Sequence, residues 1–304
     1  IEIIDSTTWN QIFKCSARIL KTLPPAPALL HAFRYIASMT LHQALQASSA
    51  SPQADRAWKL FFLLPWLLLQ SPAHRPNRRT LTSIISERVN NFLALKFSDL
   101  FEAAAANANA LRDQQQDHQV NSSDLPDRKK QFRIQAELAN GNTSKAAHLM
   151  ESTATFANPD DHEVKLQLNQ LFIKDPIIQF QPTVPVATPK LLVPKDIENA
   201  IKHSRRSAAG SSGWNITFIR AICGSKNALT LMATMFNRLL SQQVPPDLFA
   251  TFASGLLTSL RKPDGGIRPI VTGDAFLRLL SKTITMKEQR RIAATLEPIQ
   301  VGVG

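Results

Sequence analysis

A short basic segment carries the side chains best suited to bind a phosphate. The segment Arg261–Lys282 reads RKPDGGIRPIVTGDAFLRLLSK. Its Pro-Asp-Gly-Gly stretch predicts a tight turn, because Pro fixes φ, Asp caps the turn and Gly accepts a positive φ. The apolar runs on either side, 256–262 and 267–271, then predict a β-hairpin. Lys262 offers a compact charge and Arg268 a planar fork beside the turn, so the hairpin suits a triphosphate.

The register of this hairpin decides which cation faces Arg268. A two-residue Asp264-Gly265 loop pairs Arg261 with Arg268, whereas a three-residue loop that includes Gly266 pairs Lys262 with Arg268. We predict the second register, which would bring Lys262 and Arg268 together where both could contact a phosphate. The alternative is an ordinary exposed hairpin with solvated charges, which is the commoner case when turn chemistry is considered alone.

A loop of small residues, Ser207–Trp214, is a second candidate phosphate site. Gly210 and Gly213 can turn backbone N–H groups towards a phosphate ahead of a helix. Arg205 and Arg206 directly precede the loop and add positive charge. Taken alone the pattern is weak, because most such loops are simply flexible.

Other chemistries find little support in the residue pattern. Asp160-Asp161 follows Asn-Pro and precedes a helical pattern, so we interpret it as a helix N-cap and not as a metal site. The scattered histidines form no Ser-His-Asp or Cys-His arrangement. Cys15 and Cys223 form neither a zinc spacing nor a disulfide framework, which favours a reduced, intracellular protein, nuclear or cytoplasmic. The apolar run 60–69 is too short to span a bilayer and predicts a buried helix pair, so no membrane partner is expected.

Composition indicates a helix-rich chain with a polyanionic partner. The 304 residues carry a formal net charge of +12 and only 10 glycines. That charge favours a nucleic-acid partner over generic surface charge. The length is sufficient for two domains. The chain begins with Ile1 and ends within a pattern, so we expect a fragment of a longer protein.

The helices and loops that must position these residues can be predicted from hydrophobic periodicity and from the residues that begin or end helices. Residues 1–155 predict successive helices, with 103–116 either helical or partly disordered. Five prolines between 176 and 194 indicate an extended linker. Three helices are expected after it. The first covers 197–204 and is capped by Asp196, and the second is capped by Ser225 and ended by Pro245-Pro246. The third begins at Asp274, with Leu277, Leu280 and Ile284 facing inward and Arg278, Lys282 and Arg290 facing outward.

The hairpin closely resembles the fingers hairpin of reverse transcriptases, especially those of non-LTR retrotransposons. The resemblance continues through Arg268-Pro-Ile-Val and the following helix to Lys282. Ser207–Trp214 is similar to the Ala-x-Gly-x-Ser-Gly-Trp segment that lies along the template strand in those enzymes, although Ser211 stands where they often have Pro. Weaker similarities at 58–69, at 136–147 and in the final Gln-Val-Gly-Val-Gly extend the resemblance over roughly residues 55 to 304.

The resemblance implies a mostly α fold with a small β part. It predicts a helical N-terminal extension (1–155), a Pro-rich linker (156–196) and an incomplete, α+β fingers portion (197–304). It implies RNA-templated DNA synthesis, with template RNA, primer DNA and deoxynucleoside triphosphates as partners. Mg²⁺ is the metal expected for the whole enzyme, on aspartates beyond Gly304, so the chain itself would be inactive. Besides Lys262 and Arg268 for the nucleotide, the residues expected to bind nucleic acid are Arg205, Arg206, Gly210, Gly213, Arg261, Arg278 and Lys282.

Two other functions fit the same residues. The first is a non-enzymatic, helix-rich nucleic-acid-binding protein, for example the remnant of a decayed element. The second is a purely structural scaffold, which would show no measurable affinity for RNA.

Overall fold

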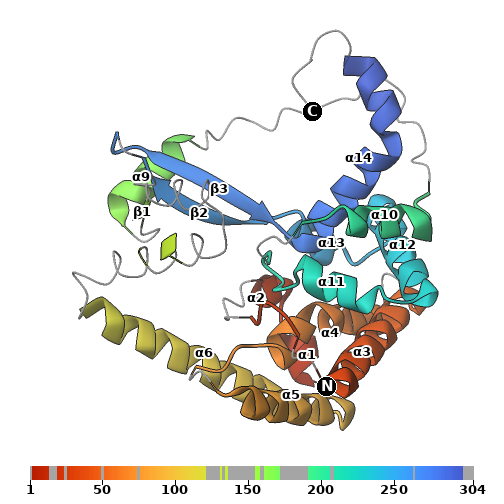
Figure 1. Ribbon diagram of the computed structural model, residues 1–304, viewed down its shortest axis with the longest axis horizontal. Helices are drawn as coiled ribbons and strands as arrows, with labels where there is room; N and C mark the ends of the chain where they lie inside the picture. Colours follow the sequence, from red (N-terminus) through yellow and green to blue (C-terminus); the bar gives the residue numbers. More distant parts are fainter. Residues whose placement is uncertain are drawn as a thin grey trace. The chain divides into compact units, whose positions relative to one another are not determined.

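The computed structural model describes residues 2–13, 19–23, 26–48, 51–73, 76–120, 131, 134–135, 155–157, 161–171, 191–205, 209–262 and 264–296. Within them the chain is mostly helical, with one small antiparallel sheet (Figure 1). The chain divides into two compact units. The first comprises Ile1–Ala108, Pro182–Leu256 and Thr272–Gly304, and the second comprises Asn109–Gln181 and Leu257–Val271. None of the described helices is long and apolar enough to cross a membrane.

The first unit is helical. Its elements are α1 (Glu2–Ser6), α2 (Trp9–Phe13), α3 (Pro27–Gln46), α4 (Pro52–Leu68), α5 (Arg78–Leu93), α10 (Pro194–Lys202), α11 (Ile216–Ile222), α12 (Lys226–Leu240), α13 (Pro246–Phe252) and α14 (Ala275–Leu296). A further helix, α6 (Phe97–Val120), begins in this unit and ends in the second. The low-complexity stretch 103–116 is therefore helical.

Segments far apart in the sequence build one hydrophobic core in this unit. Trp214 is fully buried, and its ring centroid lies 5.0 Å from that of Phe61, 5.2 Å from that of Phe276 and 5.8 Å from that of Phe33. Aromatic side chains each bury about 150–250 Å² and dominate core energetics. The predicted regions 1–155 and 197–304 consequently do not coincide with the compact units, because α3 and α4 share a core with α11 and α14.

A proline in α4 explains one of these long-range contacts. Pro65 lies inside the helix and has no N–H, so it cannot donate to the carbonyl of Phe61 one turn earlier. The indole Nε1 of Trp214 donates to that carbonyl instead, at 3.2 Å. Residues 60–68 of the apolar run all belong to the single helix α4, so the expected helix pair was wrong.

The helix ends match the sequence prediction at the start of α12 but differ from it at α10 and at the end of α12. Ser225 accepts the Ala228 N–H at 3.2 Å and begins α12, as predicted. Asp196 does not precede its helix: it lies in the first turn of α10 and accepts the Val193 N–H at 3.0 Å. Pro245-Pro246 does not end α12, which stops at Leu240, but begins α13, where Pro fits because the first helical N–H needs no partner.

The second unit contains most of a small sheet and one short helix. Strands β1 (Thr155–Phe156), β2 (Gly255–Arg261) and β3 (Ile267–Gly273) occur in the order β1-β2-β3, with β1 antiparallel to β2. Ala157, Ile267 and two residues of α9 (His162–Leu171), Val164 and Leu168, form its buried cluster. Asp161 caps α9, since its carboxylate accepts the Glu163 N–H at 3.0 Å. The predicted Pro-rich linker (156–196) is not extended where the structure describes it, because it contains α9 and the start of α10. Residues 172–190 of this linker, and residues 136–150 of the region predicted as successive helices, lie outside the described residues.

Candidate nucleic-acid interface

The hairpin forms as predicted, but its turn begins one residue earlier than either expected register. The Lys262 N–H donates to the Gly266 carbonyl at 2.8 Å, and the Gly265 N–H donates to the Lys262 carbonyl at 3.1 Å. Gly265 adopts φ +83°, which a residue with a side chain would resist. Lys262 therefore lies opposite Gly266, and counting outwards places Arg268 opposite Leu260. The predicted pairing of Lys262 with Arg268 was wrong.

Lys262 and Arg268 nevertheless lie on the same face of the hairpin. Side chains alternate along a strand, so Arg268, two residues beyond Gly266, is the diagonal neighbour of Lys262. A Cβ placed on Gly266 would lie 3.7 Å from Lys262 Cδ, which shows that the lysine stem covers this glycine. Both cations are exposed, and neither forms an ion pair with the described part of the chain. The face can bring a point charge and a planar fork to one anion.

Arg261 has a different environment on the opposite face. Its guanidinium forms an ion pair with Asp161 at 3.4 Å, and its side chain is 41% exposed. The neighbouring strand residue across the sheet, Ile267, is buried in the cluster beneath α9. Arg261 thus joins β2 to the start of α9, and we expect it to contribute less to nucleic-acid binding than the two cations on the other face.

The small-residue loop is packed into the first unit. Gly210 is buried, and a Cβ placed on it would lie 2.4 Å from Asp274 Cα, so only glycine fits. Gly213 is also buried and has φ +78°, and a Cβ at this position would lie 3.1 Å from Ile19 and 3.3 Å from Pro65. Both glycines are required by close packing against neighbouring segments.

Three backbone N–H groups at the end of this loop are already engaged. The Ser212 N–H donates to Asp274 Oδ2 at 3.2 Å, and the Trp214 N–H donates to Ser212 Oγ at 3.3 Å. The Gly213 N–H donates to the Gly210 carbonyl at 3.1 Å. In this conformation the three groups are not available to a phosphate, so the expected cradle around Gly213 is not formed.

Asp274 is the acceptor that holds the loop. Its carboxylate is fully buried and accepts the Ser212 hydroxyl at 2.5 Å and the Phe276 N–H at 3.0 Å, in addition to the Ser212 N–H. Burial raises the pKa of this carboxyl, although the bonds from Ser212 and Phe276 and the charge of Arg278 oppose the rise. The sequence predicted Asp274 as the start of a helix, and α14 does begin beyond it. Its bond to Ser212, 62 residues away, has no local sequence signal.

Basic residues near the end of α10 are used to satisfy helix carbonyls. Lys282 donates from Nζ to the His203 carbonyl at 2.5 Å, and Arg220 donates to the carbonyls of Ile201 and Ser204 at 3.0 and 2.9 Å. The last carbonyls of a helix lack intrahelical partners, and cations there also offset the helix dipole. The Lys282 ammonium group therefore binds a carbonyl of the protein, whereas the sequence predicted an outward side chain free for nucleic acid.

The remaining predicted cations are distributed as follows. Arg205 is exposed immediately after the Ser204 carbonyl. Arg278 is partly buried on α14 near Asp274, and Arg290 is exposed further along that helix. Arg206 lies outside the described residues.

The inward face of α14 was predicted only in part. Leu280 is buried as predicted, while Leu277 and Ile284 are partly buried. The most deeply buried side chains of this helix, Phe276 and Leu279, were not predicted.

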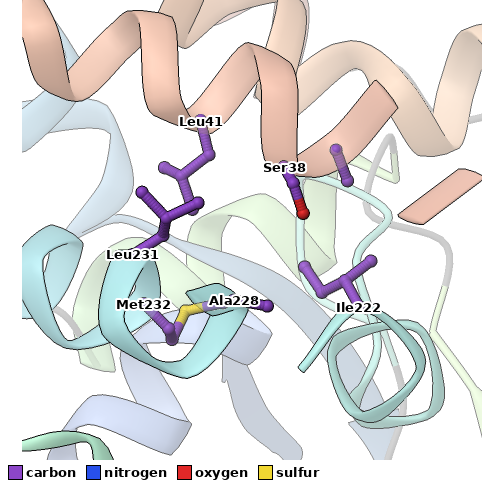
Figure 2. Close-up of a pocket in the computed structure, with 7 residues that line it drawn as sticks. Ser38, Leu41, Ile222, Ala228, Leu231 and Met232 are labelled. Atoms are coloured by element: carbon purple, nitrogen blue, oxygen red, sulfur yellow. The ribbon is translucent and has the colours of Figure 1, made fainter. Parts of the chain in front are cut away.

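Two cavities in the described part of the first unit are lined by none of the predicted site residues. Figure 2 shows an apolar cavity of about 10 Å³ between α3 and α11–α12, where Ser38 and Leu41 face Ile222 and Met232. That is room for about one water molecule. No three described His, Cys, Asp or Glu side chains lie close enough to hold a metal ion.

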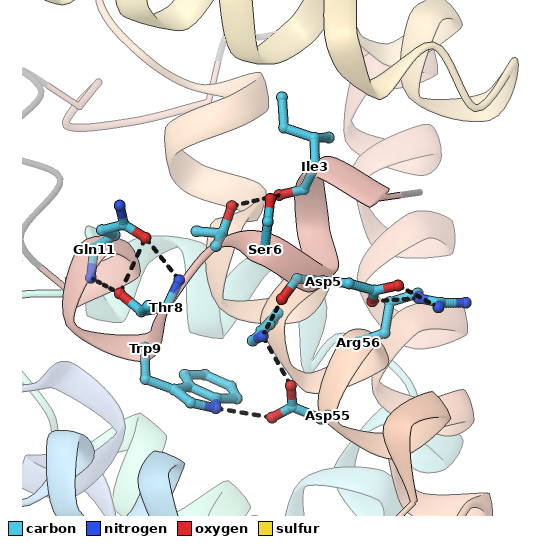
Figure 3. Close-up of polar contacts among 10 residues, drawn as sticks. Ile3, Asp5, Ser6, Thr8, Trp9, Gln11, Asp55 and Arg56 are labelled. Carbon is cyan, nitrogen blue, oxygen red and sulfur yellow. Dashed lines mark hydrogen bonds and ion pairs between the residues drawn. The ribbon is translucent and has the colours of Figure 1, made fainter.

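An open groove of about 470 Å³ lies beside α1, α2 and the start of α4, and polar bonds fix its wall. Trp9 Nε1 donates to Asp55 at 2.8 Å, and Lys59 forms an ion pair with Asp55 at 2.9 Å (Figure 3). Arg56 is paired with Asp5. These bonds attach α1 and α2 to α4, which accounts for the polar residues on structural grounds.

Comparison with known proteins gives no family assignment. No family model matches the chain, and no curated protein or solved structure is significantly similar to it.

Proposed function

We propose that this chain is part of an RNA-directed DNA polymerase of the non-LTR retrotransposon type, in which it binds template RNA and the incoming nucleotide. The observation that supports the proposal most is the face of the hairpin that carries Lys262 and Arg268. Both side chains are exposed beside the turn, and they have the types and order that the fingers resemblance requires. No metal-binding role is assigned to the residues of this chain.

The chemistry of this face suits a triphosphate. Arg268 can engage two phosphate oxygens through parallel N–H donors, while Lys262 adds a mobile point charge. Pro269 follows Arg268 in β3, which lies at the edge of the described sheet. Because Pro has no N–H to donate and edge charges discourage pairing with another strand, the strand can keep its cations exposed.

RNA binding is proposed to rest on a broad set of exposed cations without base recognition. Some basic side chains already use a donor within the protein: Arg34, Arg88 and Lys287 donate to the carbonyls of Ala221, Gln70 and Leu191 at 2.6, 2.7 and 2.7 Å. If the remaining cations neutralise about five phosphates, log affinity falls with log salt concentration at a slope of about −3.5.

The first test is a titration of the full chain with fluorescent single-stranded RNA at several salt concentrations. Arg205→Ala and Arg268→Ala should each weaken binding slightly and reduce the slope by about 0.7. Lys226→Ala is the matched control, because Lys226 is exposed at the start of α12 and lies outside the two basic segments, 203–206 and 261–291, on which RNA binding is proposed to depend. Binding that does not change between low and moderate salt would contradict the proposal.

The second test separates nucleotide binding from RNA binding in a polymerase-active form of the protein. Arg268→Ala should lower nucleotide efficiency about ten- to hundredfold, since a charge-assisted bond contributes about 1.5–3 kcal/mol. Arg268→Lys should recover part of the loss, and Lys262→Ala should act more weakly in the same direction. If Arg268→Ala left nucleotide efficiency intact, or weakened RNA binding as much as nucleotide efficiency, the triphosphate role of the hairpin would be contradicted.

A further inference from the structure

Two cations from different helices are held at the C-terminal end of α10. Lys282, on α14, donates from Nζ to the His203 carbonyl at 2.5 Å. Arg220, on α11, donates from Nη2 to the carbonyls of Ile201 and Ser204 at 3.0 and 2.9 Å. Because the carbonyls of His203 and Ser204 belong to adjacent residues, the fold brings a lysine and an arginine to one short stretch of backbone.

The two cations exceed the negative charge of the helix end. The unpaired carbonyls at the C-terminal end of a helix are equivalent to about half a negative charge, whereas Arg220 and Lys282 bring two positive charges. The acidic side chains of α10 are already paired, Asp196 with Lys287 and Glu198 with both Lys195 and Lys202. The end of α10 therefore keeps a surplus of positive charge, to which the exposed Arg205 adds.

Binding a carbonyl does not use all the donors of either cation. An ammonium group has more N–H donors than the one that Lys282 uses here, and the bonds of Arg220 involve Nη2 and not Nε or Nη1. Arg220 is exposed and Lys282 is partly exposed. Long cationic side chains lose rotamer freedom when they bind a ligand, but the carbonyl bonds already restrict these two. Their remaining donors are thus ordered in advance for an anion.

We propose that Arg220 and Lys282, together with Arg205, form a site at the end of α10 that binds the phosphate backbone of single-stranded RNA. This inference rests on the proposed function and adds Arg220, which lies outside the basic segments that the sequence indicated. The arginine fork and the lysine point charge both suit phosphate oxygens. Contacts of this kind fix the position of the strand without reading its bases. All three residues belong to the first compact unit.

The test titrates the full chain with fluorescent single-stranded RNA at several salt concentrations. Arg220→Met, which removes the donors and the charge, should reduce the salt slope by about 0.7 and weaken binding about fivefold at about 0.1 M salt. Lys282→Met should act similarly, and the double variant should reduce the slope by about 1.4. Arg34→Met is the matched control, because Arg34 is also exposed and donates to a helix carbonyl, that of Ala221, but lies on α3 outside the site.

Arg220→Lys distinguishes a phosphate contact from a purely structural cap of α10. Lysine keeps the charge but lacks the planar fork, so the salt slope should return to the wild-type value. Circular dichroism establishes that each variant is folded. A slope for Arg220→Lys as low as that for Arg220→Met would overturn the site, and so would equal reductions in Arg220→Met and Arg34→Met.

Two further outcomes separate this inference from the proposed function. If the wild-type chain binds RNA with the expected slope and Arg220→Met leaves that slope unchanged, this inference alone is overturned. The same holds if Arg220→Met abolishes binding of inorganic pyrophosphate but not of RNA, because the site would then take a free phosphate. A wild-type chain without RNA affinity would overturn the proposed function as well.

Discussion

Replacing Trp214 by Phe should destabilise the protein more than the change in ring size requires. The smaller ring buries roughly 50 Å² less, or about 1 kcal/mol at about 25 cal/mol per Å². The substitution also removes the indole donor to the Phe61 carbonyl, to which Pro65 has no N–H to offer. A buried carbonyl left without a donor costs about 1–3 kcal/mol. The expected loss in the free energy of unfolding is therefore about 2–4 kcal/mol.

The contribution of the hydrogen bond can be isolated with a second substitution. In a Pro65→Ala background, the new N–H at position 65 points along the helix towards the Phe61 carbonyl. That carbonyl then keeps a donor when Trp214→Phe is introduced, so the tryptophan substitution should cost about 1–2 kcal/mol less than in the wild-type chain. The two substitutions should thus show a coupling energy of that size.

The assay is chemical unfolding followed by circular dichroism, because Trp214 is one of only 4 tryptophans and fluorescence would change with the variant itself. Tyr35→Phe serves as the control, since Tyr35 is 57% exposed and surface substitutions usually fall within about 0.5 kcal/mol. If the effects of Trp214→Phe and Pro65→Ala simply added within about 0.5 kcal/mol, the bond between the indole and the helix carbonyl would be refuted.

Three further outcomes follow from single sites. Gly210→Ala should lower thermal stability more than Gly265→Ala, because the first places a Cβ 2.4 Å from a neighbouring backbone carbon while the second meets nothing within 4 Å and is strained only by φ +83°. Burial acts to raise the pKa of Asp196, but the hydrogen bonds from Lys287 and the backbone lower this pKa overall. The wild-type chain should therefore be more stable than Asp196→Asn above about pH 4. Unfolding titrations should show that this advantage is lost as pH falls below the ordinary carboxyl pKa of 3.8. Burial raises the pKa of Cys223 to about 12, so alkylation of this thiol at pH 8 should be slow in the native chain and fast in urea.

Features encoded by neighbouring residues were predictable from the sequence. Ser225 begins α12 because a side-chain oxygen satisfies a free N–H a few residues later, and this pattern is local. The hairpin follows in the same way from its turn residues. Its register was missed because it depends on which residue takes the positive φ, and two adjacent glycines offered that choice; the structure selects Gly265.

The roles of the candidate loop residues could not be read locally. Gly210 and Gly213 looked like a phosphate loop, since glycine is equally suited to approaching a ligand and to approaching another segment. Their actual neighbours, Asp274 and Pro65, are distant in sequence. The cations were ambiguous for the same reason: whether Lys282 faces solvent or a helix carbonyl depends on where α10 ends in space, which no periodicity reveals.

The shared aromatic core also has a consequence for synthesis on the ribosome. Phe61 and Trp214 are 153 residues apart in the chain, and α4 presents its apolar side to partners that emerge much later. At about 5–20 residues per second, the nascent chain waits roughly ten seconds or more between them. During that interval the first helices cannot complete their native packing. Newly made chains are therefore expected to need chaperone protection, and translation arrested before residue 214 should yield products that aggregate or are degraded.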